Sequence, residues 1–311
     1  MPRPLIIDCD PGHDDAIAII LAMASPELEV KAITAVAGNQ TLDKTFVNAR
    51  KVLTYIGKEA PVAAGAAHPL MRPLMTAPHV HGETGLDGPV FPEKILEPSP
   101  LSALELQIKV LEESKEPVTI VSVGPQTNVA KLILARPDLL PKIDHVTIMG
   151  GALLGGNWSA AAEFNIMVDP EAAEVLFKSG LPVVMHGLDV THKAVVHEAD
   201  IERFRAIPTV GGKLAAELLD FFKLYHQSGV VGIPLHDPCA VAYELRPDLF
   251  ETVECTLETE CASEFCDGTI IASMWPWDVT HIHKAVIGVD RQGFVDLLCA
   301  AFERYPKEVP A

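Results

Sequence analysis

The sequence lacks any apolar run long enough to cross a membrane. The longest such run covers residues 16–24, whereas a spanning helix needs ~20 residues. The apolar stretch that follows Met1 is too short for a secretory signal. Ser/Gly-rich linkers, blocks of one charge and internal repeats are also missing. These absences predict a soluble, cytoplasmic protein that folds as a single domain over residues 1–311.

Basic residues are scarce. The chain has 24 Lys and Arg residues against 42 Asp and Glu residues, which gives a formal net charge of −18. A protein that binds a nucleic-acid polymer needs clustered basic side chains to neutralise the phosphates. The composition therefore argues against nucleic acid as a partner, and it favours a neutral small molecule or a cation.

Cysteine pairs and nucleotide-binding glycine motifs are missing too. The six cysteines are irregularly spaced and form no CxxC pair, which in a chain of this length predicts reduced thiols. A bridge between Cys261 and Cys266 is an alternative that the spacing leaves open. No GxGxxG or P-loop pattern occurs, so nothing points to a dinucleotide- or NTP-dependent enzyme.

The first half of the chain alternates between short apolar runs, typical of strands, and longer stretches with helical periodicity. The expected strands cover residues 4–9, 29–36, 117–123, 143–149 and 182–186. The expected helices cover residues 15–24, with Asp14 as the N-terminal cap, and residues 41–56, 126–135 and 170–179. The pattern weakens afterwards, with helices expected at 198–205, 211–226, 237–245 and 291–304 and strands at 253–257 and 269–273. This alternation predicts an α/β fold with an open, mainly parallel sheet and helices on both faces.

Polar residues follow several of the predicted strands. In open α/β sheets, ligands bind at the carboxyl ends of the strands. The residues found there are Asp8, Asp10, Asn39, Val123, Glu163 and Asn165. The fold therefore predicts that these residues meet at one site.

The strongest chemical signal is the segment DCDPGHDD at residues 8–15. Its four carboxylates repel one another at a strand-to-helix turn unless a cation neutralises them. Ca²⁺ and Mg²⁺, which prefer oxygen ligands, fit such a cluster. The alternative is a solvated acidic loop in which Asp14 only caps the helix. A second fragment places His236 beside Asp237 just before a predicted helix, and it adds a candidate ligand.

Seven segments along nearly the whole chain resemble the inosine-uridine preferring nucleoside hydrolase family, and most closely its pyrimidine-specific ribonucleoside hydrolases. They are DCDPGHDDA (8–16), AGNQT (37–41), HGETGLDGP (81–89), VGPQTNVA (123–130), IMGGA (148–152), AEFNIMVDPEAA (162–173) and PLHDPC (234–239). The DPGxDD motif is nearly diagnostic of that family. The resemblance implies a nucleoside hydrolase fold with a Rossmann-like core. It also implies hydrolysis of the N-glycosidic bond between ribose and a nucleobase.

The resemblance further implies one Ca²⁺ per chain. Its ligands would be the carboxylates of Asp10, Asp15 and Asp237 together with the backbone carbonyl of Val123. Asp10 would also hold the attacking water and take its proton as the general base, which is an effect worth ~10²–10⁴-fold in rate. The bound metal would orient that water and lower its pKa.

The remaining matched residues would bind the substrate. The residues that the resemblance implies bind the ribose hydroxyls are Asp14, Asn39, Glu163, Asn165 and Asp237, with Asn157 near the 5′-hydroxyl. His81 and His236 would face the base and protonate it or hydrogen-bond to it. Glu163 and Asn165 have a plainer alternative as ordinary loop caps. By the same resemblance, uridine and cytidine are the preferred substrates, and the enzyme is a cytoplasmic homo-oligomer, most simply a tetramer.

Two segments depart from the family pattern. Residues 225–236 are shorter than usual and lack an aromatic residue that helps to enclose the base, with the shortening at 228–234. Residues 272–283 also look unlike the corresponding family segment. Neither departure touches the metal or ribose residues. A purine-preferring or nonspecific nucleoside hydrolase is therefore the alternative for the substrate.

Two other functions compete with this interpretation. A haloacid-dehalogenase-like phosphohydrolase also begins with a DxD segment after a strand. That class places Thr or Val two residues after the second Asp, where this chain has Gly12. A non-catalytic nucleoside-binding protein would have lost catalytic residues, and every expected one is present.

Overall fold

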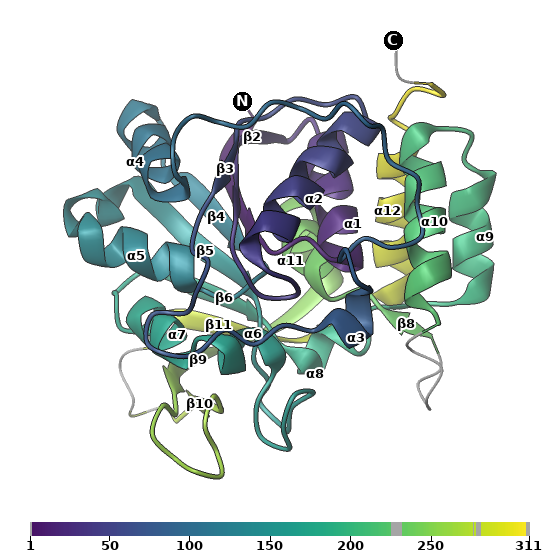
Figure 1. Ribbon diagram of the computed structural model, residues 1–311. Helices are drawn as coiled ribbons and strands as arrows, with labels where there is room; N and C mark the ends of the chain where they lie inside the picture. The colour runs from purple at the N-terminus through teal and green to yellow at the C-terminus, as the bar shows by residue number, and fades with distance from the viewer. Residues whose placement is uncertain (1, 225–231, 276, 278–280, 309–311) are drawn as a thin grey trace.

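A nine-stranded sheet runs through the centre of this computed structural model, which describes residues 2–224, 232–275, 277 and 281–308 (Figure 1). The strands are β1 (Arg3–Cys9), β2 (Leu28–Ala35), β3 (Val62–Ala64), β4 (Val118–Ser122), β5 (Ile143–Met149), β6 (Val183–His186), β9 (Phe250–Thr259), β10 (Ile270–Ser273) and β11 (His283–Val289). They stand in the order β10-β9-β11-β6-β5-β4-β1-β2-β3. From β11 to β3 all neighbours are parallel, whereas β9 and β10 pair antiparallel at one edge. The predicted α/β class with a mainly parallel sheet is confirmed.

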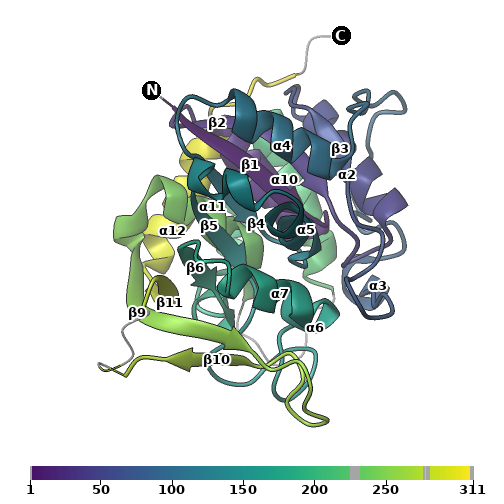
Figure 2. The same cartoon turned by 90° about the vertical axis from the view of Figure 1, so that its left-hand side faces the viewer.

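Helices cover both faces of this sheet (Figures 1 and 2). On one face lie α1 (His13–Ala24), α2 (Leu42–Tyr55), α10 (Val210–Phe222), α11 (His236–Leu245) and α12 (Arg291–Phe302), with α9 (Glu198–Ala206) packed against α10. On the other face lie α4 (Ala103–Glu113), α5 (Thr127–Ala135) and α7 (Pro170–Phe177). Leu5 and Ile7 of β1 pack with the first group and Ile6 with the second, because successive side chains of a strand point to opposite faces. A strand that is apolar on both faces needs helices on both.

The sheet grows away from β1 in two directions. β2 and β3 follow α1 on one side of β1, whereas β4, β5 and β6 are added on its other side. Ligands of open α/β sheets bind at such a reversal, outside the carboxyl ends of the strands. Asp8 of β1 pairs with Ser122 of β4, so the acidic segment that follows β1 opens onto this position.

The start of α1 corrects one prediction. Asp14 does not cap this helix, because the helix begins at His13 and Gly12 is its N-cap residue. The Asp15 carboxylate accepts the backbone N–H of Gly12 at 2.8 Å, which satisfies a donor that the helix itself leaves without a partner. The carboxylate of Asp14 is thus available to the site and is not consumed in capping.

Several elements had no counterpart among the predicted ones. They are β3, α3 (Pro78–His81), α4, α6 (Phe164–Val168), α8 (Leu188–Thr191), β7 (Val195–Val196), β8 (Ile233–Pro234) and β11. Most have between two and five residues, which is too short for an apolar period to emerge. The helix expected at 211–226 ends at Phe222, and residues 225 and 226 lie outside the described part of the chain.

The cysteines and the lengths of the helices bear on two further predictions. All six cysteines are free, so the bridge between Cys261 and Cys266 that the spacing left open is not formed. Cys9, Cys239 and Cys255 are buried, as reduced thiols in a core usually are. Among the described residues, no helix combines the length and apolar character needed to span a bilayer.

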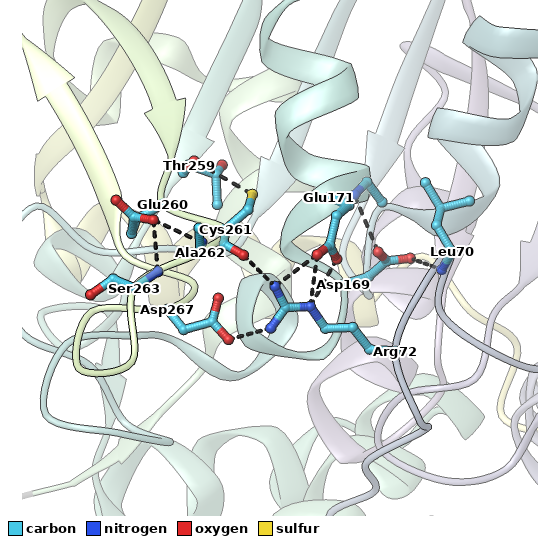
Figure 3. A network of polar contacts seen from close by, with 11 residues as sticks. Leu70, Arg72, Asp169, Glu171, Thr259, Glu260, Cys261, Ala262, Ser263 and Asp267 are labelled. Atoms are coloured by element: carbon cyan, nitrogen blue, oxygen red, sulfur yellow. Dashed lines mark hydrogen bonds and ion pairs between the residues drawn. The ribbon is translucent and has the colours of Figure 1, made fainter.

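One polar network anchors the long segment that joins β3 to α4, residues 65–102 (Figure 3). The Arg72 guanidinium binds Glu171 of α7 through Nε and Nη2 at 2.7–3.0 Å, and it also contacts the Asp267 carboxylate and the backbone carbonyl of Cys261. The Leu70 backbone N–H donates to Asp169 at 2.8 Å. Because α3 belongs to the same segment, this network fixes the approach of α3 to the carboxyl edge of the sheet.

Candidate active site

A cavity of about 560 Å³ lies at the carboxyl edge of the sheet. The predicted site residues that line it are Asp14, Asn39, His81, Val123, Asn157, Glu163, Asn165, His236 and Asp237. Asp10 and Asp15 are fully buried and hydrogen-bonded to this lining through Asn39. A larger cavity of about 720 Å³ opens near the amino ends of the strands, where Lys31, Lys115 and Glu116 line it. The structure thus brings these eleven residues together in one place. Asp8, which was expected at the same site as the end of its strand, does not line the cavity: its buried carboxylate accepts hydrogen bonds from Thr34 and Asn128.

Three carboxylates form the floor of the cavity. Asp14 and Asp15 come from the first turn of α1, and Asp237 comes from the first turn of α11. One oxygen of each lies within 4.8 Å of the others, and all three side chains are buried. Two helix N-termini therefore face the same point, and their positive ends partly offset the negative charge. These three residues are a possible metal site.

Asp10 lies beside this group and is oriented by its own contacts. Its Oδ2 accepts the Asn39 backbone N–H at 2.6 Å. Its backbone N–H donates to Asp15 Oδ1 at 3.1 Å. Its Oδ1 is buried and has no hydrogen-bond partner among the described residues. A buried carboxylate oxygen without a partner is costly, and a cation or a water held there would satisfy it.

The electrostatics of the floor also favour a cation. Burial raises the pKa of the three floor carboxyl groups and of the adjacent Asp10, and repulsion between neighbours adds to this for Asp10, Asp14 and Asp237. The pKa of Asp14 rises to about 7. No Lys or Arg occurs among the described residues that line the cavity. An oxygen-only donor set with surplus negative charge fits a hard divalent cation.

Polar side chains along the wall are held by the backbone around them. Glu163 caps α6 and accepts the backbone N–H groups of Gly151 and Asn165 at 2.9 and 3.0 Å. Asn165 Nδ2 donates to the Val123 carbonyl at 2.8 Å. Asn157 Oδ1 accepts the Phe164 N–H at 2.9 Å. Glu163 therefore caps a helix, as its plainer alternative holds, and it also lines the cavity.

Histidine and aromatic rings gather around the rest of the cavity. His236 Nδ1 lies 2.7 Å from Thr191 Oγ1 of α8, and its ring meets that of His192 edge-on at 5.7 Å. The lining residues that sequence reasoning did not single out are Ala77, His79, Val80, Met149, Trp158, Phe164, His192, Phe222 and Pro234. Applying the strand-end rule to the predicted strand at 182–186 would have led to His192.

The two segments that depart from the family pattern are only partly described. Residues 228–231 of the shortened loop lie outside the described residues, whereas Ile233 and Pro234 form β8. In the segment 272–283, residues 276 and 278–280 also lie outside them. The effect of these departures on base recognition therefore stays a hypothesis.

Comparison with known proteins agrees with the resemblance that the sequence segments show. Residues 5–296 match the family model described as inosine-uridine preferring nucleoside hydrolase. The pyrimidine-specific ribonucleoside hydrolase RihA of Salmonella schwarzengrund is 56% identical over 310 residues, which cover 98% of this chain and all of that protein. Among solved structures, a purine-preferring ribonucleoside hydrolase from Gardnerella vaginalis has a TM-score of 0.91 at 30% identity, with 97% of this chain and 98% of that chain covered. A plant nucleoside hydrolase has a TM-score of 0.89 at 31% identity, with both chains fully covered.

Proposed function

This chain belongs to the inosine-uridine preferring nucleoside hydrolase family and hydrolyses N-glycosyl compounds; on that basis we propose that it cleaves ribonucleosides with Ca²⁺ as its cofactor and with uridine and cytidine as preferred substrates. The cavity carries this proposal, because it combines a carboxylate floor, a wall of polar side chains and a group of histidines. Membership of this family rules against the haloacid-dehalogenase-like alternative and against a non-catalytic binding protein.

The proposed Ca²⁺ ligands are Asp10, Asp15, Asp237 and the carbonyl of Val123. The buried oxygens of the floor support this choice, and Asp14 stands close enough to take part. A bound Ca²⁺ would supply a positive charge that activates water and draws in hydroxyl oxygens. One ion per chain would offset the surplus of buried negative charge.

Asp10 is proposed as the general base. Its Oδ2 is occupied by the Asn39 N–H, so Oδ1 is the atom that takes the proton from the attacking water. That water adds to C1′ of the ribose while the bond from C1′ to the base breaks, and the electron pair of that bond leaves with the base. The sugar carries positive charge in between, which the buried carboxylates stabilise.

The wall residues are proposed to bind the ribose. Asp14, Asn39, Glu163, Asn165 and Asp237 would receive the 2′- and 3′-hydroxyls, and Asn157 would lie near the 5′-hydroxyl. Their backbone contacts hold Glu163, Asn165 and Asn157 in fixed orientations before substrate binds. Such preorganisation lowers the cost of orienting the sugar. His81 and His236 would face the base.

The preference for pyrimidines is tested with a panel of ribonucleosides. We expect kcat/KM for uridine and cytidine to exceed that for inosine by ~10–10³-fold, which corresponds to ~1.4–4 kcal/mol. Pyrimidines lack the readily protonated N7 of purines, so their release depends more on contacts to the carbonyl oxygens. Release of ribose from each nucleoside is the measurement, and 2′-deoxyuridine is the control that should react poorly.

The opposite order would favour the purine-preferring or nonspecific alternative. A value of kcat/KM for inosine that equals or exceeds that for uridine would contradict the pyrimidine preference and leave the hydrolase activity intact. The Gardnerella vaginalis protein, purine-preferring by its description, has the same overall fold. The fold alone therefore does not decide the base.

We further propose that residues 1–311 form one nucleoside hydrolase domain in the cytoplasm and that four copies assemble into a tetramer. Free cysteines support the location. Exposed apolar side chains on and near β10 support the assembly, because surfaces of this kind usually mark interfaces. They are Ile271, Met274, Trp275 and Trp277. Light scattering at micromolar concentration should report a tetramer, and a monomer would contradict the assembly.

A further inference from the structure

The acidic segment contains one carboxylate, Asp8, that takes no part in the proposed chemistry. Its side chain is fully buried, although Asp10 follows only two residues later. Asp8 lies on β1 at the centre of the sheet, paired with Thr34 of β2 and with Ser122 of β4. Burying a carboxyl group away from water is costly unless hydrogen bonds satisfy it. The partners of Asp8 therefore indicate what this group contributes.

One partner of Asp8 is the Asn128 side chain at the start of α5. Asn128 Oδ1 accepts the backbone N–H of Ala66 at 2.8 Å, and because a backbone N–H can only donate, Asn128 Nδ2 is directed the other way. It donates to Asp8 Oδ1 at 2.8 Å and to the carbonyl of Ala35, the last residue of β2, at 3.1 Å. Asp8 and Asn128 thus fasten β1, the end of β2 and the start of α5 to one another.

The second partner is the Thr34 hydroxyl of β2, which donates to the same oxygen, Asp8 Oδ1. Gln107 Nε2 of α4 donates to Thr34 Oγ1 at 3.1 Å and so orients the hydroxyl. All three side chains are fully buried. Both donors converge on one oxygen, so Asp8 links β2 and α5 as a hydrogen-bond acceptor.

The backbone around Asp8 adds links on both sides of β1. The Asp8 carbonyl accepts the N–H of Val123 at 2.8 Å, and the Cys9 carbonyl accepts the N–H of Val36 at 2.9 Å. Val36 and Val123 are the first residues after β2 and β4. The two chain segments that leave these strands are thus held at a fixed distance from β1, and hence from each other.

Asp10 lies between these two outgoing segments. A Cβ added at Gly38 would overlap Asp10 Oδ2, and one added at Gly124 would lie only 2.6 Å from Asp10 Oδ1. The Asp10 carboxylate therefore fits tightly between the backbone that follows β2 and the backbone that follows β4. On the first of these segments, the Asn39 N–H donates to Asp10 Oδ2. The spacing between the two segments determines where this carboxylate stands.

We propose that Asp8 is a positioning residue, whose hydrogen bonds with Thr34 and Asn128 set the spacing in which the Asp10 carboxylate is held for the cation. This inference rests on the proposed Ca²⁺ site. Asp8 acts through its acceptor atom Oδ1 and makes no contact with the ion. Groups that orient the ligands of a metal typically contribute ~10–100-fold to its affinity. An asparagine at position 8 keeps the acceptor and should keep the function, whereas an asparagine at position 10 should not.

The Ca²⁺ dissociation constant, measured by competition with a fluorescent chelator, tests this role. Asp8→Ala removes the acceptor and should raise the dissociation constant by ~10–100-fold. In Asp8→Asn, Oδ1 remains, and the neighbouring Ser122 hydroxyl can accept from the new amide. The dissociation constant of this variant should therefore stay within about 3-fold of wild type.

Thr34 provides a second pair of variants, which decides the matter if Asp8→Ala fails to fold. Thr34→Val has nearly the same shape but lacks the hydroxyl, and it should raise the dissociation constant by about 10-fold. Thr34→Ser keeps the hydroxyl and should stay within about 3-fold of wild type. Thr119→Val is the matched control, because Thr119 is a buried threonine of β4 outside these contacts, and it should bind Ca²⁺ as the wild type does.

Hydrogen exchange in the metal-free protein gives a readout that does not depend on activity. The Asn39 N–H, which Asp10 accepts, should exchange with deuterium about 10-fold faster in Thr34→Val than in the wild type. Thr34→Ser and Thr119→Val should exchange at the wild-type rate. Mass spectrometry of a peptide that covers residues 36–41 measures this. A purely structural role would lower the thermal midpoint and leave both the Ca²⁺ affinity and the Asn39 exchange unchanged.

Wild-type Ca²⁺ affinity in a folded Asp8→Ala or in Thr34→Val would overturn the proposal. Equal losses in Asp8→Asn and Asp8→Ala would also overturn it, because the charge of Asp8 and not its acceptor atom would then be what matters. A wild type that binds no Ca²⁺ would refute the proposed cofactor. The exchange of the Asn39 N–H would then still decide whether this network positions Asp10.

Discussion

Asp10→Asn should lower kcat for uridine by at least ~10²-fold with little change in KM. An asparagine fits the same space, and its amide oxygen can still accept the Asn39 N–H that Asp10 Oδ2 accepts at 2.6 Å. The amide nitrogen would then occupy the place of Oδ1, the buried oxygen without a partner among the described residues. A donor would replace the proposed proton acceptor at the point where the attacking water must lose its proton.

The loss of activity should not come from unfolding. Asp10 is buried next to Asp15, and repulsion between the two carboxyl groups helps to raise the pKa of Asp10. Removing one charge relieves that repulsion, so the thermal midpoint of the metal-free variant should be equal to or higher than that of the metal-free wild type. Circular dichroism melts measure this, and Asp43→Asn, an exposed change of the same kind, is the matched control.

A second variant distinguishes the proposed general base from the ribose-binding residues. Asp14→Ala should raise KM and lower kcat together, because Asp14 lines the cavity itself whereas Asp10 lies behind the lining. Initial rates over a range of uridine concentrations separate the two patterns. Turnover near the wild-type value in Asp10→Asn would mean that another group activates the water.

The acidic part of the site could be predicted from the sequence because its residues are close along the chain. Asp10, Asp14 and Asp15 stand within six residues, and one strand-to-helix turn delivers them together. Asp237 is distant along the chain, and its role as a ligand followed from the resemblance of the segment at 234–239 to the family, because an Asp at a helix start is by itself a weak signal. The sheet followed from the same local signals, since strands that are buried on both faces form continuous apolar runs.

The part of the cavity that is proposed to hold the nucleobase was harder to predict for a physical reason. His192, Phe222 and Trp158 reach it from a one-turn helix, the last turn of α10 and an irregular loop. The one-turn helix and the loop are too short to show an apolar period, and whether the three side chains meet depends on how α8 and α10 pack. The missed strand β11 shows a similar limit, because exposed Lys284 and Gly288, which has no side chain, interrupt its apolar pattern.

The role of Asp14 shows how a local rule can be overridden. An Asp before an apolar helical stretch normally caps the helix, and the sequence predicts this for Asp14. Here Gly12 takes the N-cap position and Asp15 accepts its N–H. The helix therefore starts earlier and directs both Asp14 and Asp15 to the floor of the cavity. Packing of α1 against α11 stabilises this arrangement and brings Asp237 to the same point.

Removing the metal should abolish hydrolysis, and adding Ca²⁺ back should restore it. Protein purified without chelator should contain about one Ca²⁺ per chain by elemental analysis, because the floor offers oxygen ligands only. Exhaustive dialysis against chelator, followed by chelator-free buffer, gives the metal-free form. Stoichiometric zinc in the purified protein, or full activity after this treatment, would contradict the calcium site.

The stability of the metal-free form should depend on pH in a defined direction. Burial and mutual repulsion raise the pKa of the floor carboxyl groups above their ordinary values, to about 7 for Asp14. A group whose pKa is raised by folding stabilises the fold while it is protonated, and that contribution is lost as the pH rises through the folded pKa. The metal-free protein should therefore be less stable at pH 8 than at pH 6.

Bound Ca²⁺ should counteract this loss, because it binds the deprotonated carboxylates that repel one another in its absence. At a Ca²⁺ concentration of ~1,000 times the dissociation constant, binding stabilises the folded state by about 4 kcal/mol. The difference in thermal midpoint between the loaded and metal-free forms should therefore be several degrees, and it should widen from pH 6 to pH 8. Thermal melts of both forms at the two pH values measure it. A difference that stays constant or narrows would show that the buried carboxylates do not bind the metal.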